Sequence, residues 1–449
     1  MKASCVVALA LLFAGLGAVS AVALDTPTTE TSHKKVAHKI KHTTTAHSAH
    51  QAVSARTTTA KTQAKTQTKT ATRTAAHTRR TRRAKVAVST SSRTTVRRAV
   101  VRRTVIRRHR YYERFTANPF LSGEVGQGDI TAGEDPVVRQ AAIDALGDLN
   151  GTAVVINPSN GRILAMVNQK LALSPGAEPC STIKLSVALA ALSEGLVTRD
   201  TMVKLPGFRM NMTQALAHSN NLYFEELGRE LGFERVHHYA TEFGLGELAG
   251  YHIQGEQLGT YPDHAIPEAQ GGVGRMCSFG QGVSMTPLQL GAIVASIANG
   301  GTLYYLQHPT NPEEVASFKP MIKRKLDIAR YIPDVQDGMA GAVEYGTARS
   351  LRVNFHELPV FGKTGTCSDN GTRFGWFASF STSPQGNLVT VFFFEGRHGT
   401  SGPHTAEITG QFYRSLWDHD YFNSKMQQAQ DAPVQMTPAR ANSAAGATQ

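Results

Sequence analysis

The sequence predicts an α/β fold of the α+β type, with a central antiparallel β-sheet flanked by helices and an all-helical subregion. Apolar runs separated by turn residues predict five strands, at 151–156, 162–167, 358–366, 374–380 and 388–394. Residues 185–300, between these strands, follow mainly helical patterns. Strands joined by short turns pair antiparallel, so we expect a hairpin from the first two and a meander from the last three.

Helix signals accompany these strands. Asp135 and Pro136 open a segment whose apolar residues recur at helical spacing, which is typical of a capped helix with proline in its first turn. The same kind of pattern predicts helices at 224–231 and 287–298. Ser181 opens another apolar segment, which we interpret as a buried helix.

Composition argues for one folded domain in the 449 residues. We expect a signal peptide or membrane anchor at 1–24, a disordered basic tail rich in Thr, Ala, Lys and Arg at 25–115, a folded domain at 116–425 and a disordered C-terminal tail at 426–449. The basic tail has almost no large apolar side chains before Val100, so it cannot bury enough apolar surface to fold.

The first 24 residues are typical of an export signal. Lys2 precedes an apolar run from Cys5 to Leu24, and small residues at Ala21 and Ala23 suit signal peptidase. The run is also about long enough to span a bilayer. Cleavage and an uncleaved anchor both stay open, and either one predicts an exported domain, in the periplasm or on the outer face of the cytoplasmic membrane.

The positive charge of the chain is concentrated in the basic tail. Residues 25–114 hold 23 Lys and Arg against 3 Asp and Glu, a net charge of +20, whereas the other residues apart from Lys2 carry −8. Such a tail attracts anionic lipid head groups or cell-wall carboxylates and phosphates, and a solvated tether is the alternative. Because an export signal precedes the tail, we expect no nucleic acid partner.

Three cysteines follow the export signal, at Cys180, Cys277 and Cys367. One disulfide and one free thiol fit an oxidising compartment, but the sequence does not choose the pair. Cys180 and Cys367 adjoin two of the motifs below, so closeness of these two cysteines is one interpretation. Even so, we favour the interpretation of Cys180 as a small buried residue, because free cysteine packs like an apolar group. No cysteine or histidine pair has ligand spacing, so we predict no metal site.

Ser181 and Lys184 form the first motif that carries chemistry. Side chains at i and i+3 of a helix share a face, so the lysine amine lies beside the serine hydroxyl. A serine becomes nucleophilic when a base takes its proton, and a lysine whose pKa is lowered by burial and nearby cations can be that base. The N–H groups of a helix N-terminus suit developing negative charge. A capping serine and a surface lysine are the structural alternative.

Ser219 and Asn221 form a second motif, just ahead of an apolar helix. The hydroxyl of Ser219 can relay a proton, and the amide of Asn221 can bind a peptide-like carbonyl. Helix capping by Ser219 or Asn220 is the alternative.

The third motif is Lys363-Thr364-Gly365-Thr366, on a predicted strand. Gly365 lets another backbone approach the strand closely. A lysine and two hydroxyl groups beside it can hold a substrate carboxylate. The alternative is an exposed edge strand protected by a lysine.

In this order, the three motifs resemble those of the penicillin-binding protein transpeptidases, a serine-lysine family to which the serine β-lactamases also belong. The resemblance covers roughly residues 130–418. Three supporting segments agree with it, at 153–166, 280–289 and 345–348. Ser368-Asp369-Asn370 also spells a β-lactamase element, but it follows the third motif in a predicted hairpin turn. We therefore assign that role to Ser219 and Asn221.

The resemblance implies a peptidoglycan D,D-transpeptidase that needs no metal or organic cofactor. Lys184 would deprotonate Ser181, whose oxygen attacks the carbonyl between the two terminal D-alanines of a stem peptide. Backbone N–H groups of Ser181 and Thr366 would form the oxyanion hole. Ser219 would pass the proton to the departing D-alanine.

The resemblance also implies the substrate contacts and the inhibitors. Asn221 would hold the substrate amide, while Lys363, Thr364 and Thr366, with Gly365 between them, would bind the terminal carboxylate. An amine of a neighbouring stem peptide would then resolve the acyl-enzyme by cross-linking. β-Lactams would be trapped as stable acyl adducts.

Three other functions stay open for the same residues. A D,D-carboxypeptidase uses water as the acceptor, and a class D-like β-lactamase would need an efficient deacylation base, such as a carbamylated Lys184. A catalytically silent peptidoglycan-binding or β-lactam-sensing module is the third. It is considered because Glu178-Pro179-Cys180 stands where the family usually has Pro-Gly before the nucleophile.

Overall fold

The computed structural model describes residues 114–425, and the expected leader, basic tail and C-terminal tail lie outside these residues, apart from the end of the basic tail. The helices are α1 (Pro136–Leu146), α2 (Gln169–Ala172), α3 (Lys184–Ser193), α4 (Met212–Ala217), α5 (Asn221–Glu242), α6 (Gly272–Phe279), α7 (Pro287–Ala298), α8 (Pro312–Ala316), α9 (Ile332–Glu344) and α10 (Gly402–Asp418). The strands are β1 (Gly151–Asn157), β2 (Arg162–Val167), β3 (Val203–Leu205), β4 (Phe208–Met210), β5 (Thr302–Tyr304), β6 (Ile322–Lys325), β7 (Val360–Asp369), β8 (Thr372–Ser383) and β9 (Gly386–Gly396).

The five predicted strands form one antiparallel sheet in the order β2-β1-β9-β8-β7. The predicted α+β fold, with its antiparallel sheet and flanking helices, is therefore confirmed. Strands β7, β8 and β9 extend two to three residues beyond their predicted limits, except that β7 begins two residues later than predicted. Strand β7 forms one edge of the sheet, so its outer side pairs with no strand among the described residues.

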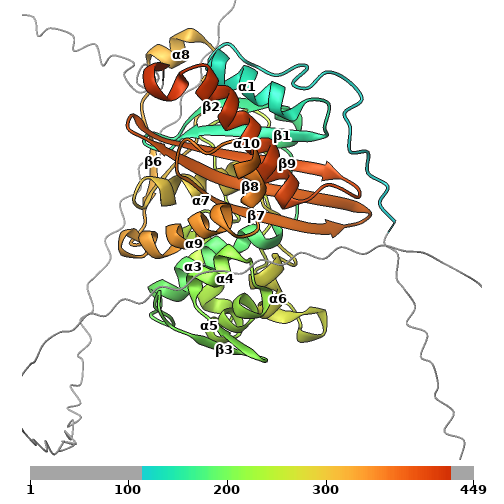
Figure 1. Cartoon of the computed structure of the whole chain (residues 1–449), viewed down its shortest axis with the longest axis vertical. Helices are drawn as coiled ribbons and strands as arrows, with labels where there is room; N and C mark the ends of the chain where they lie inside the picture. The colour runs from blue at the N-terminus through green and yellow to red at the C-terminus, as the bar shows by residue number, and fades with distance from the viewer. Residues whose placement is uncertain (1–113, 426–449) are drawn as a thin grey trace, which may run out of the picture. The chain divides into compact units, whose positions relative to one another are not determined.

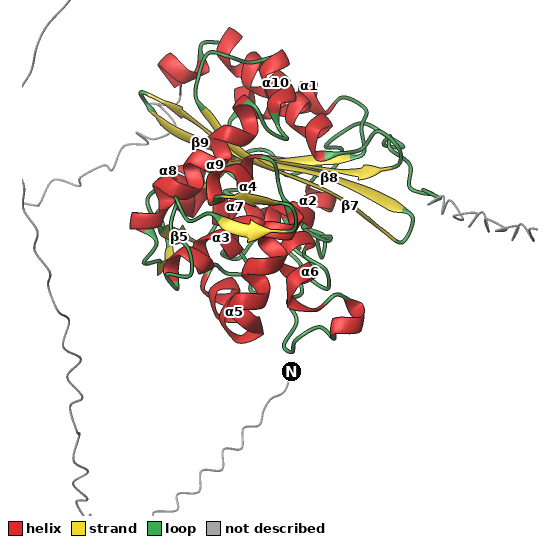
Figure 2. Ribbon diagram, turned by 60° about the horizontal axis from the view of Figure 1, so that its bottom comes forward, coloured by secondary structure: helices red, strands yellow, loops and turns green. Residues whose placement is uncertain are grey.

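Helices cover both faces of this sheet. Helices α1 and α10 pack on one face, whereas α7 and the helical subregion lie on the other, as Figures 1 and 2 show. Strand β1 is buried along its whole length because its alternate side chains enter two different cores. Val154 and Ile156 face the helical subregion, and Ala153 and Val155 face α1 and α10.

Two helices begin as the sequence predicts. Asp135 caps α1 by accepting the N–H groups of Val137 and Val138. Helix α7 spans the predicted residues 287–298, and every one of its residues is buried. A helix that is apolar all round is stable only inside a core, and α7 fills that place beneath β9, β1 and β8.

The region from 185 to 300 is less helical than predicted. It contains the two-stranded sheet β3–β4, and no α-helix occurs between α5 and α6. Helix α5 is itself interrupted at Gly232, which has a φ of 75°. Glycine and proline are frequent in the segment after α5, and both disfavour helix. Within residues 114–425, no helix combines the length and apolar character needed to cross a bilayer.

Candidate active site

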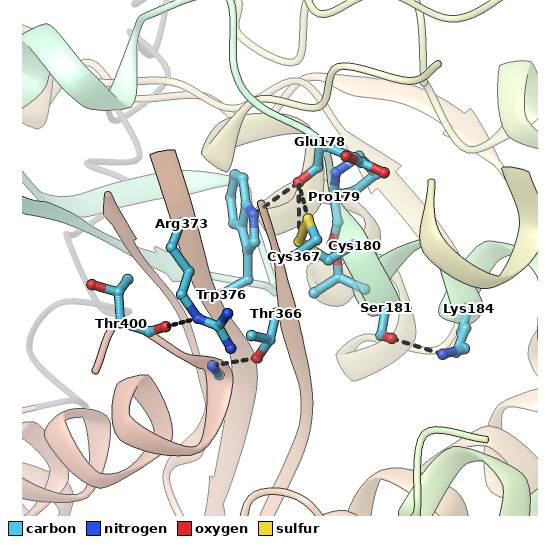
Figure 3. The surroundings of a disulfide bond; sticks show 12 residues. Glu178, Pro179, Cys180, Ser181, Lys184, Thr366, Cys367, Arg373, Trp376 and Thr400 are labelled. Carbon is cyan, nitrogen blue, oxygen red and sulfur yellow. Dashed lines mark hydrogen bonds between the residues drawn. A yellow bond between two sulfur atoms is a disulfide. The ribbon is translucent and has the colours of Figure 1, made fainter. Parts of the chain in front are cut away.

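Ser181 and Lys184 lie where a 3-10 helix, η1 (Cys180–Ile183), continues into α3. The serine is on this tight turn, and the lysine is the first residue of the α-helix. Lys184 Nζ lies 2.7 Å from Ser181 Oγ. Figure 3 draws this hydrogen bond as a dashed line. Because the Lys184 side chain is fully buried, the alternative of a surface lysine is wrong.

The other contacts of Lys184 determine the direction of its lone pair. Its Nζ lies 2.6 Å from Asn221 Oδ1 and 3.1 Å from the carbonyl oxygen of Ser219, two acceptors that engage N–H groups. A neutral amine has two N–H donors and one lone pair, so the lone pair is left for a hydroxyl, and Ser181 Oγ at 2.7 Å is nearer to Nζ than Ser219 Oγ at 3.2 Å. Burial, and then the neighbouring charge of Lys363, lower the pKa of Lys184 well below its usual value. These contacts suit a general base.

The second motif occupies the bend between α4 and α5. Ser219 has a φ of 53°, and Asn220 caps α5 by accepting the N–H of Tyr223. Since Asn220 does the capping, the side chains of Ser219 and Asn221 are both available to Lys184.

Lys363 reaches the same point from β7. Its Nζ lies 2.8 Å from Ser219 Oγ and donates to the carbonyl oxygen of Thr364 at 3.0 Å. Lys184 Nζ lies 3.2 Å from the same hydroxyl oxygen, so Ser219 stands between two amines. Burial lowers the pKa of Lys363 to about 7. Strand β7 is an edge strand, as the alternative supposed, but its lysine is fully buried rather than exposed.

The remaining residues of the third motif face different neighbours. Thr366 Oγ1 accepts the N–H of Gly402 at the start of α10, at 2.7 Å. A Cβ at Gly365 would lie 2.9 Å from the carbonyl oxygen of Pro179, so only glycine fits without a shift. The third motif therefore lies directly against the η1 turn.

Thr347 is a residue whose contact the sequence analysis did not foresee. Its hydroxyl lies 2.6 Å from Thr364 Oγ1, and its backbone N–H donates to Ala217 O. Thr347 thus links the third motif to the segment that leads into Ser219. In the sequence, Thr347 stood out only as part of the supporting segment 345–348, and this segment did not predict a role for the residue.

The cysteine interpretation is corrected by the structure. Cys180 and Cys367 form a disulfide, so Cys180 is not a free buried residue, and Cys277 is the free, buried thiol. Burial raises the pKa of Cys277 to about 12. The sequence did contain a signal for this disulfide, since each bridged cysteine is next to a motif. Motifs that form one site lie close together, and the residues next to them then lie close together as well.

Ser368-Asp369-Asn370 lies at the end of β7 and in the turn before β8, where Asn370 has a φ of 46°. This turn position agrees with the prediction. Beside it, a cavity of about 760 Å³ is lined by Glu178, Thr366, Cys367 and Arg275 among others. Burial, and then the nearby carboxylate of Asp369, raise the pKa of Glu178 to about 7.

Taken together, η1, α3, the α4–α5 bend and β7 bring Ser181, Lys184, Ser219, Asn221 and Lys363 into one cluster. Thr364, Gly365 and Thr366 extend it along β7. A serine hydroxyl beside a buried amine is an arrangement suited to serine acyl transfer, and a second hydroxyl and a second amine lie next to this pair.

Comparisons with known proteins agree with this arrangement. The family described as penicillin binding protein transpeptidase domain matches residues 151–414, more than half of the chain. Stage V sporulation protein D of Bacillus subtilis (strain 168) is 28% identical over 315 residues, which are 58% of this chain and 48% of that protein. Peptidoglycan D,D-transpeptidase MrdA of Acinetobacter baumannii is 25% identical over 372 residues, covering 63% and 54%.

Among solved structures, Pseudomonas aeruginosa PBP2 in complex with WCK 5153 has the same fold. The TM-score is 0.54 at 24% identity, covering 63% of this chain and 74% of that one. The chain spans about half the length of the curated relatives named above. By its matched domain, its fold and its three motifs, the chain belongs to the penicillin-binding protein transpeptidase domain family.

Proposed function

We propose that the chain is a peptidoglycan D,D-transpeptidase, which forms a serine acyl-enzyme with D-Ala-D-Ala stem peptides and is inhibited by β-lactams. One observation carries the proposal: the buried amine of Lys184 lies 2.7 Å from Ser181 Oγ and has a lowered pKa. The name of one relative, peptidoglycan D,D-transpeptidase MrdA, supports a role in the cell wall.

Acylation begins when the neutral amine of Lys184 takes the proton of Ser181. The serine oxygen attacks the carbonyl carbon between the two D-alanines, and the carbonyl oxygen becomes an oxyanion. The N–H groups of Ser181 and Thr366 stabilise this charge from η1 and β7. The contact of Gly365 with Pro179 supports this pairing, because it brings the two segments together.

The tetrahedral intermediate then collapses and expels D-alanine. The proton held by Lys184 passes through the hydroxyl of Ser219 to the leaving nitrogen, a route supported by the 3.2 Å separation of Lys184 Nζ and Ser219 Oγ. Lys363, hydrogen-bonded to the same hydroxyl, favours transfer away from Ser219 by its positive charge. The amine of a second stem peptide attacks the acyl-enzyme and restores Ser181.

Substrate binding uses the remaining predicted residues. Thr364, Thr366 and the charge of Lys363 hold the terminal carboxylate, with Gly365 between the two threonines. Asn221 holds the substrate amide with its N–H₂ group while its Oδ1 stays on Lys184.

The proposal is tested with a fluorescent penicillin and a pentapeptide stem. We expect a stable covalent label on the full chain, its loss in Ser181→Ala, and cross-linked products when donor and acceptor stems are supplied. Trimmed stems without cross-links would identify a D,D-carboxypeptidase, and rapid loss of the label a β-lactamase. No label on the folded wild-type chain would contradict acyl transfer and favour a silent module.

We also propose that the domain acts outside the cytoplasm and that its basic tail contacts anionic lipid or cell wall. The net charge of +20 over residues 25–114 supports this contact. Deleting these residues should weaken retention in the cell envelope while leaving penicillin labelling intact. Retention that is equal at low and high salt would argue against electrostatic anchoring.

A further inference from the structure

The disulfide joins the two segments that are proposed to form the oxyanion hole. Cys180 is in η1 and Cys367 in β7, 187 residues apart in the sequence, and their Cα atoms are 5.5 Å apart. Cys180 is bonded directly to Ser181, and Cys367 directly to Thr366. Each oxyanion N–H group therefore belongs to the residue next to a bridged cysteine, and neighbouring Cα atoms are only about 3.8 Å apart.

Few other attachments join these two segments. Among residues 114–425, no backbone hydrogen bond links η1 to β7. Trp376 Nε1 in β8 donates to the carbonyl oxygen of Glu178 at 3.1 Å, and both sulfur atoms lie 3.4–3.7 Å from that oxygen (Figure 3). Gly365 of β7 also packs closely against Pro179 and against the side chain of Thr182 in η1.

The backbone at Cys180 also needs to be held. Its φ is 53°, a left-handed conformation that non-glycine residues adopt at a cost of about 1–2 kcal/mol. When the bridge opens, this residue is free to return to an ordinary conformation, and the N–H of Ser181 turns with it. An oxyanion hole works only when its donors lie about 2.7–3.1 Å from the developing charge, so a small rotation matters.

We propose that Cys180 and Cys367 are positioning residues for acyl transfer: their disulfide fixes the distance between the Ser181 and Thr366 N–H groups. The proposal rests on the proposed function, because it assigns a role within the same site. The bridge acts through its neighbours and touches no reacting atom. Opening it slows the chemical step and leaves the first binding of the penicillin nearly unchanged.

The experiment compares four forms of the full chain: the wild type, the wild type reduced with a phosphine, Cys180→Ala/Cys367→Ala, and Cys277→Ala. The phosphine becomes its oxide with oxygen from water, and the disulfide becomes two thiols. The reductant can reach Cys367, which is partly exposed and lines the cavity of about 760 Å³. Cys277→Ala is the matched control because its thiol is free and buried.

Stopped-flow acylation by a chromogenic β-lactam separates the acylation rate constant from the dissociation constant. Removing the bridge, by reduction or by the double substitution, should lower the rate constant about 10- to 100-fold and change the dissociation constant less than threefold. Infrared difference spectra should show the acyl carbonyl stretch at higher frequency, because its hydrogen bonds are weaker. Cys277→Ala should behave like the wild type, and the reductant should not affect the double variant.

Wild-type rates and an unchanged carbonyl stretch in the folded double variant would overturn the positioning role. If the double variant does not fold, the reduced wild type gives the same measurement, and an unchanged rate and stretch there would overturn it equally. Absence of acylation in every form, including the oxidised wild type, would instead refute the proposed function and this role with it.

Discussion

At the scale of single residues, the proposed mechanism gives two buried lysines opposite protonation states. In it, Lys184 is neutral and takes a proton, whereas Lys363 is charged and holds a carboxylate. Burial lowers the pKa of both amines, and Lys363, at about 7, is balanced between its two forms. The two amines both lie beside the hydroxyl of Ser219, and the charge of Lys363 also lowers the pKa of Lys184.

The first prediction concerns the pH dependence of acylation. Below pH 7 Lys363 carries its proton and attracts the carboxylate of benzylpenicillin, and above pH 7 the free enzyme loses this charge. The second-order rate constant of acylation should therefore fall above about pH 7, as stopped-flow measurements across pH 5–10 would show. The methyl ester of benzylpenicillin has no carboxylate, so its fall above pH 7 should be smaller and reflect only the effect of Lys363 on proton transfer through Ser219. Superimposable profiles for acid and ester would contradict carboxylate binding by Lys363.

The second prediction concerns stability. An unfolded lysine keeps its proton up to about pH 10.4, whereas folded Lys363 loses it near 7. Between these values the unfolded state binds more protons, so the free energy of unfolding rises with pH, and the cost of burying Lys363 is largest below pH 7. Lys363→Met should therefore stabilise the domain by about 1–2 kcal/mol at pH 6.5 while abolishing acylation.

Thermal unfolding at pH 6.5 and pH 9 measures this effect. The gain in melting temperature from Lys363→Met should be smaller at the higher pH. Lys170→Met, at an exposed position on α2, is the control and should change neither stability nor acylation. If Lys363→Met melts at a lower temperature than the wild type at both pH values, Lys363 stabilises the fold and the prediction is contradicted.

At the scale of elements, β7 serves as both the edge of the sheet and one wall of the site. It can do so because Gly365 lets η1 approach and because Lys363 and Ser219 meet across the gap. The same strand carries Cys367. Residues 363–367 of β7 therefore contact neighbouring segments in three ways: by a hydrogen bond from Lys363, by packing of Gly365 and by the disulfide of Cys367.

The third prediction tests this close approach. In Gly365→Ala the new Cβ would meet Pro179 O at 2.9 Å and Trp376 Cβ at 3.0 Å, so β7 must move away from η1. We expect acylation to be at least about 10-fold slower, as measured by stopped-flow. We also expect the free energy of unfolding to fall by about 1–3 kcal/mol, as measured by thermal unfolding. Gly123→Ala is the matched control, because its Cβ would meet only a flexible glutamine side chain. Unchanged acylation in Gly365→Ala would mean that β7 does not set the geometry of the site.

Element positions were predictable from the sequence to different degrees. Helix α7 and β1, β2, β7, β8 and β9 follow from local apolar patterns and turn residues, so their places were predicted well. The β3–β4 hairpin was missed because each strand has only three residues, which is too short for an alternation of apolar and polar residues to be recognised. The long segment after α5 was missed because its conformation depends on contacts with distant residues.

At the scale of the whole molecule, the candidate site lies where the sheet edge meets the helical subregion. The sheet separates two cores, and the chain passes between them several times, so the three motifs reach one point from distant parts of the sequence. The order of the motifs indicated these residues. The Thr347–Thr364 contact could not be predicted, because it depends on which segments become neighbours in space. The disulfide was indicated only by the position of its two cysteines beside motifs, which did not by itself choose the pair.

The most direct test of the account is the acylation of Ser181 with and without the Lys184 amine. Peptide mass mapping after treatment with benzylpenicillin should find the adduct on Ser181 in the wild type. Lys184→Met, which keeps the buried volume without a base, should lower the acylation rate constant about 10²- to 10⁴-fold while the chain stays folded. An adduct on another residue, or a folded Lys184→Met chain that is acylated at the wild-type rate, would contradict the central claim.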